Sequence, residues 1–315
     1  MTTTRIVIAL GGNALQKKGE ASAEAQKKIA AETARQLVPL ISQGNQIVIV
    51  HGNGPQVGDI LLHQEALNTP EVPTLPLDSC GAMSQGSIGY WLQQAISNEL
   101  RNKGIDISVA TIVTQTIVDA NDPAFSDPSK PIGPFYDTEA EARLAAQSRG
   151  FVVKEDSGRG WRRVVPSPIP TEIVEEPIIK ELVNKGYIII AAGGGGVPVI
   201  KTEQGISGVE AVIDKDMSAS VLADRIGAEM LLILTSVDAV KINFGKPDEK
   251  SLGNVTCEEI IHYRDMDEFA SGSMLPKINA SLAFVEKQRG SRKAIVTSLE
   301  TAYDAVGGGV GTVIY

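Results

Sequence analysis

Three lysines stand in sequence contexts that suit the binding of an anion. Lys130 lies in the proline-rich run 127–134, which stiffens its backbone, so its ammonium group has little conformational freedom to lose. Lys215 and Lys277 stand at the expected starts of two helices, where the helix dipole is already positive. A cation is favourable there when an anion binds beside it. Any one of these lysines alone is more often a solvated surface residue, but together they predict an anion site.

Two acidic residues flank the second of these lysines. Asp214 and Asp216 stand on either side of Lys215. Carboxylates in this position either orient neighbouring lysines or bind Mg²⁺. Orientation of the lysines is at least as probable a role for Asp214, whereas Asp216 remains a possible metal ligand.

Glycine clusters are the second chemical signal. The chain contains 31 glycines, and three clusters directly follow short apolar runs. The clusters are Gly11-Gly12, Gly52-Asn53-Gly54 and 193–196, after the runs 5–10, 46–50 and 187–192. Glycines after parallel strands let backbone N–H groups and helix N-termini approach a phosphate. One such pair is usually just a tight turn, but three at one sheet edge favour a phosphate-bearing ligand.

The elements that position these residues follow an alternating pattern of strands and helices. The apolar runs are rich in β-branched residues and hydrophobic at nearly every position, which is typical of strands buried on both faces of a parallel sheet. Further strands are expected at 107–113, 231–234, 294–298 and 312–315. Helices are expected at 20–42, 57–67, 177–184, 216–225 and 276–287, and another should start at the capping box of Thr256 and Glu259. The pattern predicts an α/β fold around an open, mainly parallel sheet.

One region interrupts this alternation. Residues 120–170 are rich in Pro, Asp, Ser and Gly, with strand-like pieces at 151–154 and 162–165 and a short helix near 138–147. Insertions at the carboxyl edge of a sheet often act as lids. We expect a single compact unit, 1–315, with a protruding lid at 120–170.

Composition excludes several classes of protein. The net charge of −9 argues against binding to a nucleic-acid backbone, which needs a basic surface. Two cysteines are too few for a disulfide framework, and the N-terminus does not resemble a signal peptide, so a cytoplasmic location is expected. The uncharged stretch 79–98 is too polar for a membrane span and is interpreted as a buried or subunit-facing helix.

Other catalytic motifs fit less well. A Walker A sequence is absent, and the run 52–58 matches a dinucleotide fingerprint only with one additional residue and with Pro55 removing an N–H donor. A dinucleotide-binding oxidoreductase therefore remains a rival. The three histidines show no metal-ligand spacing, and His51 is expected to be a packed, hydrogen-bonded residue.

Eight motifs, in order along nearly the entire chain, resemble those of the carbamate kinases, which belong to the amino acid kinase superfamily. The most specific are Lys130-Pro-Ile-Gly-Pro-Phe-Tyr136 and the Trp-Arg-Arg-Val-Val string within 160–168. The other motifs occupy 9–15, 51–58, 193–199, 208–216, 242–247 and 272–277. The resemblance implies a homodimeric cytoplasmic enzyme with a three-layer α/β/α sandwich and a protruding subdomain. It implies the reaction ATP + carbamate ⇌ ADP + carbamoyl phosphate, with Mg²⁺ accompanying the nucleotide, used to make ATP during arginine or related nitrogen-compound breakdown.

The resemblance also implies roles for individual residues. The transferring phosphoryl group would lie at Gly11, Gly12 and Asn13. Carbamate or its phosphate would lie near Gly52, Asn53 and Gly54. Catalysis and phosphate binding would fall to Lys130, Lys215 and Lys277, organised by Asp214. The nucleotide would bind to the half 185–315, at Gly194, Gly195, Thr235, Ser236, Asp238, Lys241, Lys246 and Met274.

The sequence departs from the wider superfamily at one informative position. Most amino acid kinases have a lysine two residues before the first glycine pair, where this chain has Ala9. Lys130 from the lid is the expected replacement, which would make lid closure part of assembling the site. Many carbamate kinases have an acid at the position of Ser236, so the nucleotide contacts there remain open. A kinase for another carboxylate and a non-catalytic nucleotide sensor remain alternatives.

Overall fold

The computed structural model describes residues 3–16, 20–156 and 160–315, with only the backbone of Asn13. Its centre is an eight-stranded sheet in the order β15-β17-β16-β12-β1-β2-β9-β3, in which only the β16–β17 pair is antiparallel. The strands are β1 (Arg5–Leu10), β2 (Gln46–His51), β3 (Val109–Thr111), β9 (Ile188–Ile190), β12 (Met230–Thr235), β15 (Asn254–Val255), β16 (Lys293–Ser298) and β17 (Thr312–Ile314). The predicted strands are thus present, with ends shifted by one to a few residues.

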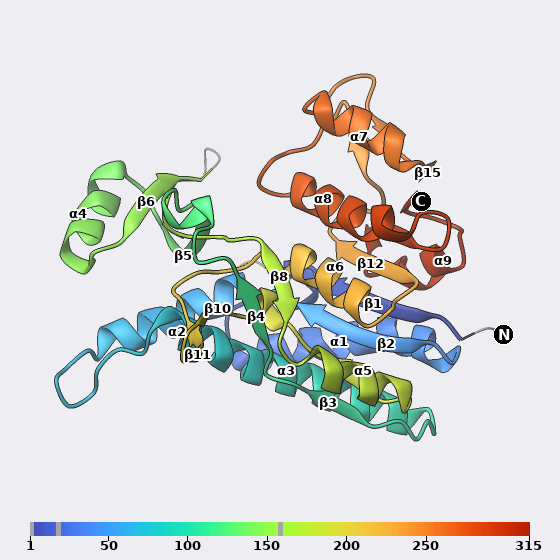
Figure 1. The fold of residues 1–315 in the computed structure, drawn as a ribbon, viewed down its shortest axis with the longest axis horizontal. Coiled ribbons are helices and arrows are strands. Elements are labelled where there is room, and N and C mark those ends of the chain that lie inside the picture. Colours follow the sequence, from blue (N-terminus) through green and yellow to red (C-terminus); the bar gives the residue numbers. More distant parts are fainter. Residues whose placement is uncertain (1–2, 17–19, 157–159) are drawn as a thin grey trace.

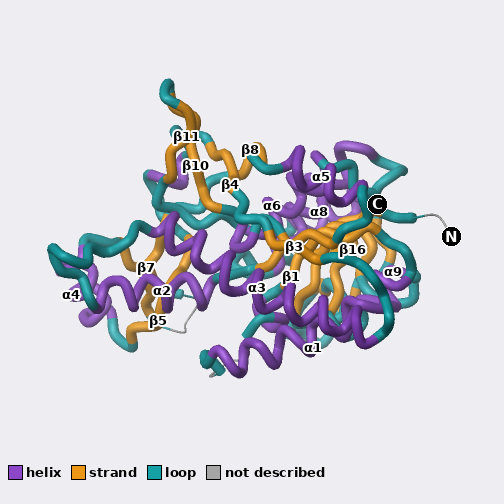
Figure 2. The backbone as a smooth tube through the Cα atoms, turned by 90° about the horizontal axis from the view of Figure 1, so that it is seen from below, coloured by secondary structure: helices purple, strands orange, loops and turns teal. Residues whose placement is uncertain are grey.

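Helices cover both faces of this sheet (Figures 1 and 2). Alternate residues of β1 point to opposite cores, because successive side chains of a strand face opposite ways. Val7 and Ala9 pack with α5, α6 and α8, whereas Ile6, Ile8 and Leu10 pack with α1, α3 and α9. These helices are α1 (Ala23–Ser42), α3 (Leu77–Asn102), α5 (Glu176–Asn184), α6 (Lys215–Arg225), α8 (Met274–Val285) and α9 (Ala302–Val306). The three-layer α/β/α sandwich is confirmed.

The remaining helices and turns follow local capping rules. α7 (Cys257–Asp265) begins with the predicted capping box, since Thr256 and Glu259 bond each other's backbone N–H groups. α2 (Gly54–Ala66) starts earlier than predicted because Pro55 sits in its first turn, where a proline costs no intrahelical hydrogen bond. The other short pieces are β13 (Lys241–Ile242), β14 (Lys250–Ser251) and the 3₁₀ turns η1 (Gly12–Ala14), η2 (Pro123–Phe125), η3 (Gly193–Gly195) and η4 (Glu286–Gln288).

The interruption near 120–170 contains a small antiparallel sheet in the order β5-β7-β6 with helix α4 (Figure 1). Its elements are β5 (Lys130–Tyr136), α4 (Glu139–Arg149), β6 (Val152–Glu155) and β7 (Trp161–Val165). We call these four elements the insert. β5 was not predicted, because Pro131 and Pro134 suggested a loop. An edge strand tolerates prolines, since its outer N–H groups need no partner, and β5 lies at the edge.

A second unpredicted sheet connects the insert to the core. Its order is β11-β10-β4-β8, and its strands are β4 (Gln115–Val118), β8 (Pro170–Ile173), β10 (Val197–Thr202) and β11 (Gly205–Gly208). Polar residues and prolines in these short strands hid them from periodicity. β4 precedes the insert in the chain and β8 follows it, and the two pair with each other, so they hold its two roots together.

The uncharged stretch 79–98 forms most of α3 and lies against the core on one side. Within the described part of the chain, no helix is long and apolar enough to cross a membrane.

Candidate active site

The three glycine clusters meet at one edge of the main sheet. β1 pairs in parallel with both β2 and β12, so Leu10 lies opposite His51 on one side and Leu234 on the other. β9 pairs in parallel with β2, which brings 193–196 to the same edge. The carboxyl ends of neighbouring parallel strands therefore place the clusters together, as the sequence predicted.

Lysines from three separate elements converge at this edge on two aspartates. Lys130 of β5 holds Asp214 with an Nζ–Oδ2 distance of 2.8 Å. Lys215, the first residue of α6, holds Asp216 with an Nζ–Oδ1 distance of 2.5 Å. Lys277 of α8 reaches the other oxygen of Asp216, with an Nζ–Oδ2 distance of 3.1 Å. Three ammonium groups are thus fixed at the sheet edge by two carboxylates.

Asp214 is the N-cap of α6 as well as the partner of Lys130. Its Oδ1 accepts hydrogen bonds from the backbone N–H groups of Asp216 and Met217. Burial alone raises the pKa of Asp214. The charge and hydrogen bond of Lys130, the charge of Lys215 and the N–H of Met217 outweigh it and lower that pKa to about 2. Asp214 therefore stays ionised.

Burial has the opposite consequence for the central lysine. It lowers the pKa of Lys215, because a buried ammonium loses its hydration, while the nearby Asp216 carboxylate opposes this shift and Lys277 adds to it. A further anion beside Lys215 would favour its charged form. The site is therefore electrostatically matched to a negative ligand, although the whole chain carries a charge of −9.

Three adjoining cavities surround the lysines. The first, of about 270 Å³, lies between the insert, the start of α2 and the lysines; we call it the insert cavity. The second, of about 250 Å³, contains Gly11, Gly12, Lys215 and Lys277; we call it the central cavity. The third, also about 250 Å³, is lined by residues of the C-terminal half, including Phe244 and Met274; we call it the outer cavity. Lys277 lines all three, so they adjoin one another, and we call the three together the trench.

The glycines of the site have two different reasons to be glycine. A Cβ at Gly11 would lie 2.6 Å from the carbonyl oxygen of Leu234, and one at Gly194, where φ is +66°, would lie 2.1 Å from Nδ2 of Asn53. These positions are fixed by close packing. At Gly12 and Gly54 a Cβ would meet nothing within 4 Å. Open space at these two positions, which line the cavities, leaves room for a ligand to approach the backbone.

The remaining residues of the phosphate and carbamate set lie as follows. Gly52 lines the insert cavity beside Lys215. Asn53 also lines it, and its Nδ2 donates to Oγ of Ser84 at 2.8 Å, which orients the amide. Asn13 belongs to η1, but its side chain lies outside the described residues.

The structure separates the residues expected to bind nucleotide. Thr235, Ser236, Lys241 and Met274 line the outer cavity, where Lys241 is held by Glu249. Gly194 lines the insert cavity instead, and Gly195 is buried, with its carbonyl accepting from Thr116 and Ser218. Asp238 is exposed, and its carbonyl accepts from Thr297. Lys246 is exposed in the turn between β13 and β14.

Several residues that line the trench were not predicted from the sequence. Phe244 lies at the outer cavity and is 71% exposed, an unusual position for a phenylalanine. Its place within the 242–247 motif was the signal available in the sequence. Glu300 lines the central cavity, and Gln56 lines the insert cavity. Gln56 stands inside the 51–58 motif, but nothing in its spacing indicated its buried environment.

His51 lies beneath the glycine clusters. It is 1% exposed, its Nδ1 is 2.7 Å from the carbonyl oxygen of Gly52, and a Cβ at Gly193 would lie 2.4 Å from its Nε2. Burial lowers the pKa of His51 to about 4; the hydrogen bond to Gly52 opposes this shift, and the charge of Lys215 adds to it. The prediction of a packed, hydrogen-bonded histidine is confirmed.

The site offers no separate protein cage for a metal ion. Among residues 3–16, 20–156 and 160–315, no group of three or more His, Cys, Asp or Glu side chains could hold one. Both oxygens of Asp216 already accept from lysines. A cation here would need ligands supplied by the bound substrate.

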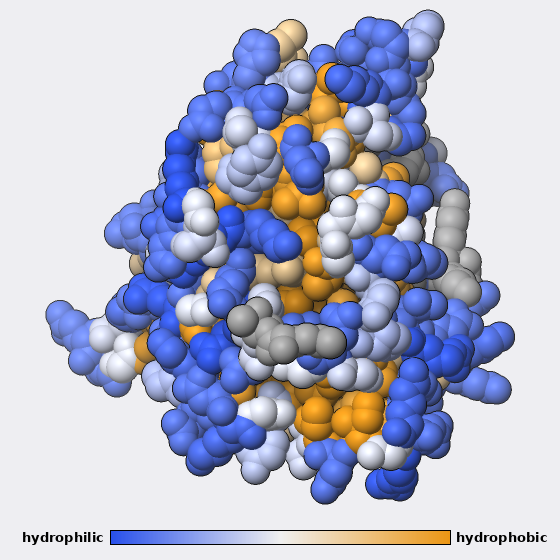
Figure 3. Space-filling view, turned by 90° about the vertical axis from the view of Figure 1, so that its right-hand side faces the viewer, coloured by the Kyte–Doolittle hydropathy of each residue, from blue (hydrophilic) through white to orange (hydrophobic). Residues whose placement is uncertain are grey.

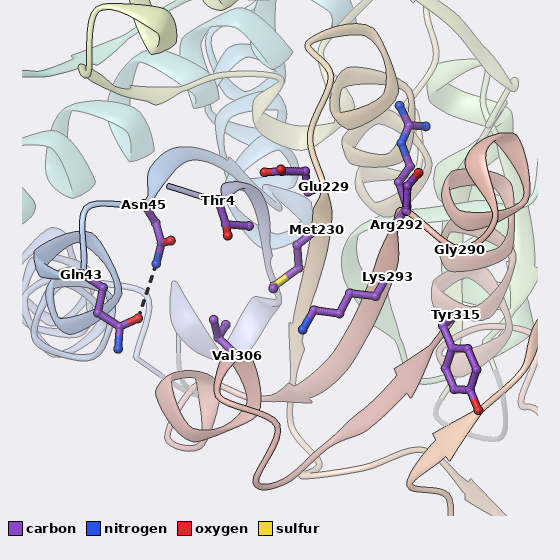
Figure 4. Close-up of a pocket in the computed structure, with 11 residues that line it drawn as sticks. Thr4, Gln43, Asn45, Glu229, Met230, Gly290, Arg292, Lys293, Val306 and Tyr315 are labelled. Carbon is purple, nitrogen blue, oxygen red and sulfur yellow. Dashed lines mark hydrogen bonds between the residues drawn. The ribbon is translucent and has the colours of Figure 1, made fainter. Parts of the chain in front are cut away.

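A larger cavity, about 550 Å³, lies at the opposite edge of the sheet (Figure 4). Thr4, Asn45, Met230 and Lys293 line it at or near the amino ends of β1, β2, β12 and β16. That side of the molecule shows a band of apolar atoms between hydrophilic margins (Figure 3). This edge lacks the glycine clusters and the lysine trio, and ligands of open α/β sheets bind at the carboxyl edge. We therefore place the active site in the trench.

Comparison with known proteins agrees with this geometry. Residues 4–298 match the amino acid kinase family. The chain is 52% identical to the carbamate kinase of Latilactobacillus sakei over 315 residues, covering 100% of this chain and 99% of that protein. It is also 52% identical to the carbamate kinase of Thermococcus kodakarensis over 311 residues, covering 98% of both.

The fold is also similar to those of carbamate kinases whose structures have been solved. A carbamate kinase from Giardia lamblia bound to AMP-PNP superposes with a TM-score of 0.90 at 43% identity, covering 99% of this chain and 98% of that one. The chain therefore belongs to the amino acid kinase family, among its carbamate kinases.

Proposed function

We propose that the protein catalyses reversible phosphoryl transfer, ATP + carbamate ⇌ ADP + carbamoyl phosphate. The observation that carries this proposal is the convergence of Lys130, Lys215 and Lys277 on two aspartates at the glycine-rich edge. The cavities on either side of the lysines are suited to a small substrate under the insert and a nucleotide under the C-terminal half, 185–315. The carbamate kinases that this chain resembles support the choice of substrate.

The chemistry requires neutralisation of charge more than proton transfer. Carbamate is already an anion with a nucleophilic oxygen, so no general base is needed to attack the γ-phosphorus. The obstacle is repulsion between that oxygen and the anionic phosphoryl group. Catalysis of phosphoryl transfer is mainly positioning and electrostatic stabilisation, which fixed ammonium groups and backbone N–H groups supply.

The arrangement of the trench suggests a division of labour among the lysines. Lys215 and Lys277 line both the central and the insert cavity. They therefore lie beside the phosphoryl group both before and after it is transferred. Lys130 is carried by the insert and reaches the small substrate. Asp214 and Asp216 keep the ammonium groups in place before the ligand arrives. Movement of the lid, 120–170, which contains the insert, would then complete the site, because the chain has Ala9 where most amino acid kinases have a lysine.

The nucleotide is proposed to occupy the central and outer cavities. Thr235 and Ser236 line both of them, and Phe244 with Met274 offers apolar surface for a base. The relative from Giardia lamblia was solved with AMP-PNP, which supports nucleotide binding by this fold. We propose that Mg²⁺ enters with ATP or ADP, held by the polyphosphate oxygens, where it supplies further positive charge.

Three wider properties are part of the proposal. We expect a homodimer, formed on the face of α3. We expect the enzyme to be cytoplasmic, because nucleotides are present in the cytoplasm and free thiols such as those of Cys80 and Cys257 remain reduced there. We expect the reaction to form ATP from carbamoyl phosphate in the breakdown of arginine or related nitrogen compounds.

The deciding experiment measures ATP formed from ADP and carbamoyl phosphate. Lys130→Ala, Lys215→Ala and Lys277→Ala should each lower kcat by about 10²–10³, because each removes one fixed donor at the developing charge. Lys201→Ala is the matched control, since Lys201 is exposed and pairs with Glu172 on the second sheet, away from the site. Near-normal turnover in all three site variants would refute the assignment.

The same assay, together with measurements of ligand binding, tests the role of Lys130 and distinguishes the proposed function from its rivals. Lys130→Ala should weaken use of carbamoyl phosphate more than binding of ADP, and an equal loss would place Lys130 elsewhere. Tight NAD(P) binding without ATP formation would favour an oxidoreductase. Nucleotide binding without turnover would favour a sensor, and ATP formation only from another acyl phosphate would favour a different carboxylate kinase.

A further inference from the structure

The walls of the insert cavity are rich in hydrogen-bond donors. Lys130, Lys215 and Lys277 present ammonium groups, and the start of α2 presents backbone N–H groups, since the side chain of its N-cap residue, Asn53, does not cap them. Donors suit the anionic end of a substrate. The amino group of carbamate or carbamoyl phosphate is itself a donor, so its recognition requires an acceptor in the same cavity.

Gln56, a residue that lines this cavity, carries a side-chain carbonyl acceptor, and the orientation of its amide is fixed by neighbouring amides. Gln26 donates through Nε2 to the carbonyl oxygen of Ala21 at 2.9 Å, which turns its Oε1 toward Gln56. Nε2 of Gln56 then donates to Oε1 of Gln26 at 2.9 Å and to Oε1 of Gln16 at 3.1 Å. Reversing the Gln56 amide would set carbonyl oxygens against each other. Its own carbonyl is therefore directed away from this cluster.

That carbonyl has no hydrogen-bond partner among the residues that the structure describes. Gln56 is 5% exposed and lines the insert cavity, and its Oε1 is buried without a hydrogen bond to any described residue. Leaving a buried acceptor unpaired is unfavourable, and native structures seldom do so without a functional reason. The aspartate acceptors of the same cavity, Asp214 and Asp216, are held by lysines.

We infer that the side-chain carbonyl of Gln56 accepts a hydrogen bond from the amino group of carbamate and of carbamoyl phosphate. This inference rests on the proposed function and adds a specificity-determining residue to it. The carbonyl distinguishes the amino-bearing substrate from acetate, which presents a methyl group at that place and cannot donate a hydrogen bond. Gln56 takes no part in the transfer of the phosphoryl group.

The test compares carbamoyl phosphate with acetyl phosphate, in which a methyl group replaces the amino group. Gln56→Met keeps the volume and the helix but removes the acceptor. We expect kcat/KM for carbamoyl phosphate to fall on the order of 10–100-fold, because a buried hydrogen bond is lost. Acetyl phosphate should retain its value, measured as a substrate or, where turnover is slow, as a competitive inhibitor. The preference for the amino-bearing substrate would therefore collapse.

Gln64→Met is the matched control. It makes the same change on the same helix, at a half-buried position that lines none of the three cavities, so the preference should stay near its original value. Equal losses for both acyl phosphates in Gln56→Met, or no loss in either, would overturn the inference and leave Gln56 a packing residue. Absence of ATP formation by the unaltered protein would instead refute the proposed function. Thermal unfolding of both variants checks that they fold.

Discussion

At the scale of single residues, the site depends on charges held in place before any ligand binds. Asp214 combines two tasks, because one of its oxygens holds Lys130 and the other caps α6. The cap fixes the direction of α6 and hence the position of Lys215, its first residue. One carboxylate thereby links the insert to the core at the point where the substrates would meet.

His51 gives a testable dependence on pH. Its pKa is about 4 in the folded protein and 6.5 ordinarily, so between these values the unfolded chain binds a proton that the folded protein does not. Stability is therefore unaffected above pH 6.5 and is lost as the pH falls toward 4. The loss in the free energy of unfolding should approach about 3 kcal/mol.

Urea unfolding at several pH values between 6.5 and 4 checks this prediction. The free energy of unfolding of two histidine variants is compared with that of the unaltered protein at each pH. His51→Asn should flatten the slope of stability against pH. His63→Asn, at an exposed position of α2, is the control and should leave the slope as it is. An unchanged slope in His51→Asn would show that other groups govern the acid sensitivity.

At the scale of elements, the insert is positioned by a close contact between α2 and β5. A Cβ at Gly58 of α2 would lie 2.7 Å from both N and Cα of Gly133 in β5. Backbone atoms cannot turn aside as a flexible side chain can. The packing of α2 against β5 therefore fixes the strand that carries Lys130.

Gly58→Ala should displace β5 and with it Lys130. We expect kcat with carbamoyl phosphate to fall on the order of 10²-fold, since a shift of about 1 Å in a catalytic group has that effect. The KM for ADP should change little, because the nucleotide cavities lie away from α2. Gly253→Ala is the control, since a Cβ there meets nothing within 4 Å. Full activity in Gly58→Ala would mean that the insert tolerates movement at this contact.

At the scale of the whole molecule, one edge of the main sheet ends in the short strand β3. Nearby surfaces expose large apolar side chains: Met83 and Tyr90 of α3 are 43% and 51% exposed, and Val113 is 52% exposed. An open edge strand beside exposed apolar residues is a surface that proteins usually cover. This is the observation that supports the proposed dimer.

The double variant Met83→Glu and Tyr90→Glu should dissociate the dimer, because like charges would meet across a two-fold interface. Light scattering coupled to gel filtration should give twice the mass of one chain for the unaltered protein and the mass of one chain for the variant. Replacing Leu144 of α4, which is 71% exposed on the insert, with Glu is the control. A monomeric unaltered protein would exclude the proposed dimer.

The sequence was most informative where structure is local. The apolar runs before the glycine clusters became β1, β2 and β9, and the capping box at Thr256 started α7, because side-chain periodicity and backbone capping act over a few residues. The second sheet and β5 were missed, because their strands are short and contain proline or polar residues. What stabilises them is pairing with distant segments.

By itself the sequence determined the lysines, the glycine clusters, the buried strands and the family to which they belong. Only the tertiary structure decided which groups meet: Lys130 with Asp214, Lys277 with Asp216, and Gln56 with two other glutamines. It also left the Gln56 carbonyl without a partner in the described part of the chain. The paired residues are 30 to 84 positions apart in the chain. Hydrogen bonds and ion pairs act over a few ångströms, so the packing of the elements decides which of these groups come within reach.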